Sequence, residues 1–394
     1  MTFAIIGCGY VADLYLLTQQ NHPGLKFVGA FDHDAGKLGA FTKRWPGRSY
    51  ASLDELLADA SVELVLNLTN PRSHLSVTRC CLEAGKHVYS EKPLAMTLTE
   101  AQELAALAAR KNLLLSSAPC SVLSETAQTL WKAVRECVVG KVRLVYASFE
   151  DGMIAPRQQP WLWRNACGAA WPAKDEFEVG CTYEHAGYVL TWLAAMFGPA
   201  LSVTSFASCQ IPDKGIQVDD MAPDFTVGCI EYADGVVARV TCGLVAPKEK
   251  SISVIGDDGV LFVGNVRNDG GPVMVRSAKP GRWQSAVANR MPWLNRWLEA
   301  RISWPGWEAM FQKRYPLVRR RSGVVVRPGK AVDFLRGPAE MAEAIREKRP
   351  CRLSAEFGAH IVEIIEVLQH PERFNGRKKM TTTFAPIQPM PWSS

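Results

Sequence analysis

The sequence TFAIIGCGYVADLYLL, residues 2–17, joins an apolar run to a pair of glycines and then to a second apolar run. Residues 2–6 are rich in strand-forming side chains, and residues 13–17 can continue as a helix. The pattern between them is G-x-G-x-x-A, in which the first glycine permits a tight turn and the second lets a pyrophosphate approach the backbone. The stretch therefore predicts a dinucleotide-binding βα unit with the phosphate charge at the helix N-terminus. The predicted cofactor contacts are Gly7, Gly9, Tyr10, Val11 and Ala12.

A second apolar run, residues 26–31, ends in Asp32. A carboxylate at this place can accept hydrogen bonds from the hydroxyls of the adenosine ribose. Its charge repels a 2′-phosphate, so Asp32 predicts NAD as the cofactor, with NADP as the alternative. The other interpretation is that Asp32 only caps a local turn with His33 and Asp34.

Alternating strands and helices continue to about residue 120. Thr97 and Glu100 have the spacing of a capping box at the start of one of these helices. Repeated βα units of this length predict a doubly wound parallel sheet with helices on both faces, a Rossmann domain over residues 1–120. The expected helices are residues 52–60, 73–84 and 97–111, and the expected strands are residues 63–68, 87–90 and 113–115.

Composition limits the classes of protein to which the chain can belong. With 394 residues it exceeds one ordinary core, so two domains are expected. Hydrophobic residues make up 47% and charged residues 21%, as in globular proteins, and no apolar run is long enough to span a bilayer. The first residues resemble a strand rather than a signal peptide. The eleven cysteines include no C-x-x-C pair, which argues against a zinc site or a disulfide framework and favours the reducing cytoplasm.

The segment AGKHVYSEKPLA, residues 84–95, carries the most specific signal in the chain. It resembles the signature of the glucose–fructose oxidoreductase / inositol dehydrogenase / rhizopine catabolism (Gfo/Idh/MocA) oxidoreductases. The glycine fingerprint and the stretch TNPRSH, residues 69–74, lie at the family's distances before it, and residues 333–368 look like its closing helices. The resemblance implies an NAD(P)-dependent oxidoreductase and covers nearly the whole chain except a middle section.

Lys92 is the chemical centre of this segment, because it follows a parallel strand at the edge where such sheets bind ligands. A lysine beside the nicotinamide can hydrogen-bond a substrate hydroxyl and help to move its proton. The resemblance implies a cis peptide before Pro93 and a role for Glu91 in orienting Lys92 or contacting the cofactor. The other interpretation is a surface lysine at a turn. The resemblance also implies a loop over the cofactor formed by Thr69, Asn70, Pro71 and His74, although His74 is equally suited to a local bond at a helix start.

A second signature is expected in the substrate domain, where family members carry an aspartate and then a histidine four residues later on one helix. Here Glu184 and Tyr188 occupy these positions, on one helix face. Both residues depart from the family pair, but a glutamate can still bind a sugar hydroxyl and a tyrosine can still donate a proton, while core packing is the alternative for Tyr188. His185 is a rival acid/base that lies about 100° away around the helix. Trp163 and Arg164 also resemble a family pair near the nicotinamide.

From residue 142 onward, successive strands without intervening helices predict a mainly antiparallel sheet. The resemblance implies an α+β domain over residues 121–380 with a large open sheet, one face packed on the cofactor domain and the other often forming an oligomer interface. A homo-oligomer, a dimer or tetramer, is therefore expected. The expected strands are residues 142–149, 202–208, 224–232, 236–243, 251–255 and 260–263.

Residues 276–330 fit the family poorly and hold thirteen Lys/Arg, two Glu and five of the twelve tryptophans. The whole chain has a net charge of +6, so the remainder is net acidic. Residues 282–321 suit a membrane interface facing anionic lipids. This hypothesis adds a peripheral contact at the inner membrane face to the cytoplasmic location that the cysteines favour. The alternatives are a grip on a diphosphate-bearing sugar, an oligomer contact or a lid. No nucleic-acid motif accompanies the basic region, and no metal site is expected.

Together these features predict an NAD(P)-dependent oxidoreductase that moves hydride to or from a ring carbon of a sugar or nucleotide sugar. Lys92 and Tyr188 would manage the proton, and Glu184 and His185 would contact the substrate with them. A role in surface polysaccharide or glycoconjugate metabolism is a hypothesis. The alternatives are a catalytically silent sugar- and NAD-binding regulator, or a redox-neutral epimerase or glycosidase with retained NAD.

Overall fold

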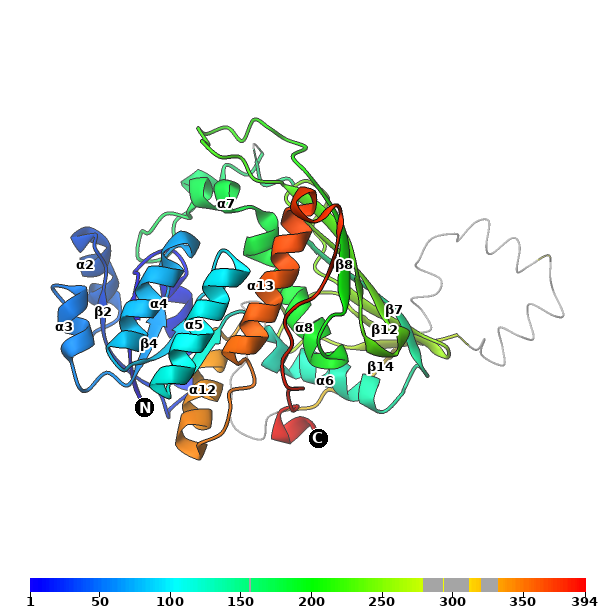
Figure 1. The fold of residues 1–394 in the computed structure, drawn as a ribbon, viewed down its shortest axis with the longest axis horizontal. Coiled ribbons are helices and arrows are strands. Elements are labelled where there is room, and N and C mark those ends of the chain that lie inside the picture. Colours follow the sequence, from blue (N-terminus) through cyan, green and yellow to red (C-terminus); the bar gives the residue numbers. More distant parts are fainter. Residues whose placement is uncertain (156, 279–292, 294–311, 320–331) are drawn as a thin grey trace.

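A computed structural model describes residues 1–155, 157–278, 293, 312–319 and 332–394. Within these residues the chain forms two sheets, with helices between and around them (Figure 1). The first sheet has six strands in the order β3-β2-β1-β4-β5-β6, all paired in parallel. Its strands are β1 Thr2–Ile6, β2 Lys26–Phe31, β3 Arg48–Ser49, β4 Leu64–Asn67, β5 His87–Ser90 and β6 Leu115–Ser117.

Helices cover the first sheet, which confirms the predicted doubly wound arrangement. They are α1 Ala12–Leu16, α2 Ala35–Arg44, α3 Leu53–Ala58, α4 His74–Glu83 and α5 Leu98–Lys111. The strand order reverses between β1 and β4, and open parallel sheets bind ligands at such a switch point. The first sheet therefore fixes where a cofactor would lie, although the boundary near residue 120 stays a prediction.

Helix α5 shows how local sequence sets these elements. The capping box between Thr97 and Glu100 is present at its start. At its end Asn112 is left-handed (φ 55°), and the Leu113 N–H donates to the Ala108 carbonyl at 2.9 Å. This C-cap uses residues that were predicted to be extended, so β6 begins at Leu115 rather than at residue 113.

The second sheet has nine strands within the described residues, in the order β14-β13-β12-β11-β7-β10-β9-β8-β15. Only the pair β7–β10 is parallel among its described pairs, so the prediction of a mainly antiparallel sheet is confirmed. The strands are β7 Val142–Glu150, β8 Ser202–Ser208, β9 Phe225–Glu231, β10 Val237–Gly243, β11 Ile252–Gly256, β12 Gly259–Val263, β13 Met274–Ser277, β14 Lys313–Arg314 and β15 Arg377–Lys379. The last three were not predicted.

One face of the second sheet packs on helices, and none of the described helices covers the other, which is called the open face below. The helices of this half are α6 Glu125–Arg135, α7 Ala173–Val179, α8 Gly187–Phe197 and α13 Ala355–Gln369, whereas α12 Arg336–Glu347 returns to pack against β5 and β6 of the first sheet. Helix α13 lies between α5 and β8 and so joins the two halves (Figure 1). The open face carries exposed Leu144, Tyr146 and Phe206. The resemblance predicts a contact with another copy on this face, and that contact stays a prediction.

The predicted membrane contact falls mostly on residues that the structure does not describe. Of the five tryptophans in the basic section, Trp293 belongs to the described residues, and it is exposed. Among the described helices, none combines the length and the apolar character needed to cross a bilayer.

Candidate active site

The glycine loop after β1 has the geometry that the sequence predicted. Gly7 has a φ of +94°, and a Cβ there would lie 2.7 Å from the carbonyl oxygen of Leu68 at the end of β4. A Cβ at Gly9 would meet no atom within 4 Å. Gly7 is therefore required by the turn, and Gly9 leaves open space where a pyrophosphate can approach. Helix α1 has only five residues, so its dipole would contribute less to phosphate binding than its free N–H groups.

Asp32 lines the same cavity as Gly7 and Gly9, and its carboxylate also orders the local turn. Its Oδ2 accepts from the Cys8 N–H at 2.7 Å, and its Oδ1 accepts from the Asp34 N–H at 2.8 Å. The turn interpretation and the ribose interpretation are thus compatible, because the backbone bonds aim the carboxylate into the cavity.

A cavity of about 670 Å³ runs from this loop to the second half of the chain. Its volume falls within the usual range for ligand sites. The open approach at Gly9, the buried carboxylate of Asp32 and this volume fit a dinucleotide. The lining includes these predicted residues: Gly7, Gly9, Tyr10, Val11, Asp32, Thr69, Asn70, Pro71, Glu91, Lys92, Glu184, His185 and Tyr188.

Lys92 stands where the two halves meet in the cavity. Its ammonium group forms an ion pair with the carboxylate of Glu184. Burial alone would lower the pKa of Lys92, but the carboxylates of Glu184, Glu176 and Glu91 outweigh it and hold that pKa above its usual range. Lys92 is therefore a charged hydrogen-bond donor at neutral pH. The peptide between Lys92 and Pro93 is cis, as the resemblance implied.

Glu91 and His74 support the backbone around Lys92. Glu91 accepts from the Tyr15 hydroxyl at 2.8 Å and from the Lys92 N–H at 2.9 Å. His74 is fully buried, with its ring nitrogens 2.6 Å from the Pro93 carbonyl oxygen and 3.1 Å from that of Thr69. His74 does not line the cavity, so it ties two loops together rather than contacting the cofactor.

Glu184 lies in a π-helical turn, Thr182–Ala186, that precedes α8. Single π turns are frequent at functional sites. Glu184, His185 and Tyr188 all line the cavity, so the predicted offset of about 100° around the helix does not keep His185 from the space where a substrate contact was predicted for it. Burial and the neighbouring carboxylate of Glu176 raise the pKa of Glu184 to about 7, against the opposing effect of Lys92.

His185 is held by two carboxylates. Its Nε2 lies 3.1 Å from Glu176 and 3.3 Å from Asp151. Its ring stacks on Phe149 with the centroids 5.0 Å apart. These contacts from β7, α7 and the loop after β7 fix the imidazole beside the catalytic candidates.

Tyr188 stacks on the same ring, with its centroid 5.0 Å from that of Phe149. The guanidinium carbon of Arg267 lies 5.0 Å from the centre of the Tyr188 ring. Burial raises the pKa of Tyr188, and the charge of Arg267 works against that rise. Core packing and a cavity-facing position coexist here, because the ring packs while the residue lines the cavity.

Trp163 and Arg164 do not line the cavity. Arg164 Nη1 donates to the carbonyls of Trp161 and Trp163 at 2.8 and 2.9 Å. The contact with the glycine loop comes instead from Asn165, whose side-chain amide donates to the Tyr10 carbonyl at 3.0 Å. Ala12 is also off the cavity, buried against the strands as its small size predicted.

Several residues at the site were not predicted. Arg267, Asp151 and Asn165 lie in loops far along the chain from the residues that they contact, whereas Glu176 lies in the short helix α7, shortly before His185. The only local signal is the pair Asp151-Gly152, a polar interruption at the end of a long apolar strand.

Comparison with known proteins places the chain among oxidoreductases. A model described as "Oxidoreductase family, NAD-binding Rossmann fold" matches residues 1–118, and a "GFO/IDH/MocA C-terminal domain" matches residues 127–262. A 1,5-anhydro-D-fructose reductase from Ensifer adhaerens is 27% identical over 282 residues, 70% of this chain and 80% of that protein.

Two solved structures share the fold. The aldose-aldose oxidoreductase from Caulobacter crescentus, complexed with glycerol, has a TM-score of 0.73 at 16% identity, covering 96% of this chain and 99% of that one. The WlbA dehydrogenase from Bordetella pertussis, in complex with NADH and UDP-GlcNAcA, has a TM-score of 0.69 at 16% identity, covering 96% and 97%. Because the two family models together match more than half of its length, the chain belongs to the Gfo/Idh/MocA family of NAD-binding oxidoreductases.

Proposed function

We propose that this oxidoreductase interconverts a hydroxyl and a keto group on a ring carbon of a sugar or nucleotide sugar. The observation that carries the proposal is the ion pair between Lys92 and Glu184, which stands in one cavity with Tyr188, Gly9 and Asp32. Related proteins support the substrate class, since one is named an anhydrofructose reductase and another is seen with UDP-GlcNAcA.

The side chains of the cavity divide the work on the substrate. When bound, NAD supplies a nicotinamide ring that accepts or returns a hydride. Lys92, charged at neutral pH, donates a hydrogen bond to the oxygen on the reacting carbon and stabilises negative charge there. In the reduction direction Tyr188 donates its phenolic proton to the oxygen on the reacting carbon and regains a proton from solvent, and Glu184 accepts hydrogen bonds from neighbouring hydroxyls. His185, fixed by Glu176 and Asp151, holds the substrate from the other side.

The direct test follows the near-ultraviolet absorbance of the reduced nicotinamide while the protein is incubated with panels of sugars, uronic acids and nucleotide sugars, in both directions. Net absorbance change with one class supports the proposal. Tight NAD binding without turnover on any panel member contradicts it and favours a regulator. Product formed without net absorbance change would show redox-neutral chemistry.

Asp32 gives a prediction about cofactor choice. Changing Asp32 to asparagine keeps its size and one acceptor but removes the charge that faces a 2′-phosphate. We expect the preference for NAD over NADP to fall by about tenfold or more, since like charges a few ångströms apart repel by more than 1 kcal/mol. Titration of protein fluorescence with each coenzyme measures the two dissociation constants.

Asp34 provides the matched control for this experiment. It is two residues away, and its carboxylate caps α2 by accepting from the N–H groups of Gly36 and Lys37. Asp34→Asn is expected to leave the coenzyme preference unchanged. An equal fall in the preference for NAD in both variants would contradict the role of Asp32 in choosing the coenzyme.

Glu184 gives a prediction about pH. Because its pKa is raised to about 7, it is protonated below that pH, where it loses its ion pair with Lys92 and part of its capacity to accept from a substrate hydroxyl. Lys92 stays charged throughout this range because its own pKa is raised. We therefore expect kcat/KM to fall about tenfold per pH unit below the inflection, and Glu184→Gln to abolish that inflection at a lower plateau.

Glu150 is the control for assigning the pH inflection to Glu184, because burial and the carboxylates of Glu249 and Asp151 also raise the pKa of Glu150 to about 7. It does not line the cavity. Glu150→Gln should retain the inflection. Loss of the inflection in Glu150→Gln, with its retention in Glu184→Gln, would transfer the titration to Glu150.

A further inference from the structure

Arg267 is a cation in the catalytic part of the cavity that the proposed chemistry does not use. It lies in the loop after β12 and lines the cavity with Lys92 and Tyr188. Its guanidinium carbon is 5.0 Å from the centre of the Tyr188 ring. The side chain is partly exposed, so it faces the space that a substrate would enter.

The other cations of this region are neutralised by partners within the described residues. Lys92 pairs with Glu184, and Lys250 pairs with Asp151. In the same part of the chain, no carboxylate lies within ion-pair distance of the Arg267 guanidinium. Among the described residues, Arg267 therefore carries a positive charge with no direct ion-pair partner beside the candidate acid/base, although its charge helps to lower the pKa of Asp151.

The loop that carries Arg267 is held in place by hydrogen bonds that join its backbone to neighbouring side chains and to another backbone segment. The Arg267 N–H donates to Asn265 Oδ1 at 2.9 Å, and the Val266 N–H donates to the Lys250 carbonyl at 2.8 Å. The hydroxyl oxygen of Thr126 on α6 lies 2.7 Å from the Asn268 carbonyl oxygen and 3.0 Å from that of Gly271, and its single proton is shared between them.

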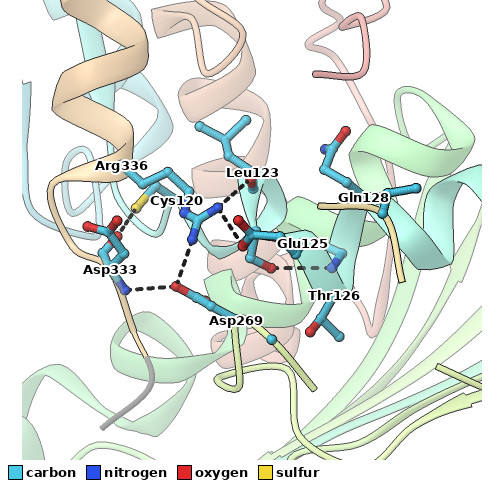
Figure 2. Close-up of polar contacts among 12 residues, drawn as sticks. Cys120, Leu123, Glu125, Thr126, Gln128, Asp269, Asp333 and Arg336 are labelled. Atoms are coloured by element: carbon cyan, nitrogen blue, oxygen red, sulfur yellow. Dashed lines mark hydrogen bonds and ion pairs between the residues drawn. The ribbon is translucent and has the colours of Figure 1, made fainter. Parts of the chain in front are cut away.

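Two residues after Arg267, the loop enters a buried charge cluster. Figure 2 shows Asp269 between the guanidinium of Arg336 and the backbone N–H of Asp333, at 3.4 and 2.8 Å. The Thr126 N–H also donates to the Asp269 carbonyl at 3.0 Å. The loop is thus fixed before a ligand binds, which lowers the ordering cost of any contact that Arg267 makes.

A guanidinium group forms two parallel hydrogen bonds with a carboxylate or a phosphate, and such pairs are among the stronger polar contacts. The position over Tyr188 puts this partner close to the oxygen that Tyr188 and Lys92 handle. We propose that Arg267 is a specificity-determining residue that binds an anionic group, carboxylate or phosphate, carried by the sugar ring near its reacting carbon. The inference rests on the proposed function and narrows its substrate class to acidic sugars.

The test measures binding and does not require turnover. Protein loaded with NADH is titrated with glucuronate, glucose 6-phosphate, glucose and UDP-glucose, and the nicotinamide fluorescence reports binding. Wild type is expected to bind one of the two acidic monosaccharides at least about tenfold more tightly than glucose, and Arg267→Met should remove that difference while leaving the affinity for NADH unchanged. Arg267→Lys, which keeps the charge but not the fork, should restore part of the difference.

Arg239 supplies the matched control. Its guanidinium carbon lies 4.2 Å from the centre of the Tyr146 ring, on the open face of the second sheet and away from the cavity. Arg239→Met should leave all four affinities unchanged. A loss confined to glucuronate identifies a carboxylate, and one confined to glucose 6-phosphate identifies a phosphate.

Three outcomes would overturn the inference: equal losses for glucose and the acidic sugars, no preference for acidic sugars in wild type, or an effect on UDP-glucose alone. The failure of the proposed function looks different. Acidic sugars would then bind through Arg267, yet no member of the turnover panels would change the nicotinamide absorbance.

Discussion

Replacing Lys92 with methionine is expected to lower kcat by about 10³-fold, within the range by which general acid–base groups accelerate reactions. Methionine has a similar length but neither charge nor a hydrogen-bond donor. The ammonium group of Lys92 is held by Glu184 and stays charged at neutral pH, so its removal leaves negative charge on the substrate oxygen without a stabilising partner. The glycine loop and Asp32, which form the far end of the cavity, are untouched. Single-turnover absorbance with NAD and the substrate found in the panel measures the loss, and fluorescence titration checks that NAD still binds.

A control is needed because the single change also leaves the buried carboxylate of Glu184 without its partner. The double variant Lys92→Met/Glu184→Gln removes both charges and restores a neutral site. It should unfold at the same urea concentration as wild type and remain as inactive as the single variant. Activity of Lys92→Met within tenfold of wild type would exclude Lys92 as a catalytic residue.

The cofactor half of the site could be predicted from the sequence because its geometry is local. Gly7 and Gly9 are needed by the turn that they themselves form, and Asp32 directly follows the strand that positions it. Lys92 likewise follows β5 closely, inside the segment of residues 84–95 that resembles the family signature. In each case the residue lies within a few positions of the strand or turn that places it, so a local sequence pattern is enough to predict where the residue lies in the fold.

The substrate half could not be predicted in the same way, since long-range packing places its residues. Arg267 reaches Tyr188 from a loop whose course is set by Asp269 and Arg336, and the latter follows an intervening section of the chain. The π turn from which His185 lines the cavity has no residue pattern that predicts it, although His185 itself was a predicted substrate contact. Asn165 contacts the glycine loop because the loop after β7 folds back onto a turn more than a hundred residues earlier in the chain, a contact that no local pattern predicts.

The buried cluster around Arg336 gives the second large expected effect. Arg336 Nη1 lies 3.0 Å from Glu125 and 3.1 Å from the Leu123 carbonyl, and Nη2 lies 3.4 Å from Asp269 (Figure 2). Asp333 joins the cluster to the first half of the chain through His22, at 2.8 Å. Changing Arg336 to methionine leaves these buried carboxylates without their shared cation. We expect the free energy of unfolding to fall by about 3–5 kcal/mol, as for other buried pairs that lose one partner.

The size of this loss should depend on pH. Burial raises the pKa of Asp269 to about 6, although Arg336 works to lower it. An acid whose pKa is higher in the folded than in the unfolded state contributes stability at low pH, and this contribution is lost as the pH rises through the folded value. Without Arg336 the pKa of Asp269 rises further, so ionising Asp269 at high pH costs the folded state more free energy in Arg336→Met than in wild type. The difference between wild type and Arg336→Met should therefore be smaller near about pH 5 than near about pH 8.

Urea unfolding of both proteins at these two pH values measures the difference, with Arg143→Met as the matched control. Arg143 makes two hydrogen bonds to Asp257 at 2.8 and 2.9 Å, but both side chains are about half exposed. Exposed pairs of this kind are worth about 1 kcal/mol at most, because water screens them. If Arg336→Met were no more destabilised than Arg143→Met near about pH 8, the cluster would not anchor the two halves. The loop that carries Arg267 would then need another support, since Asp269 is the point where that loop meets the core.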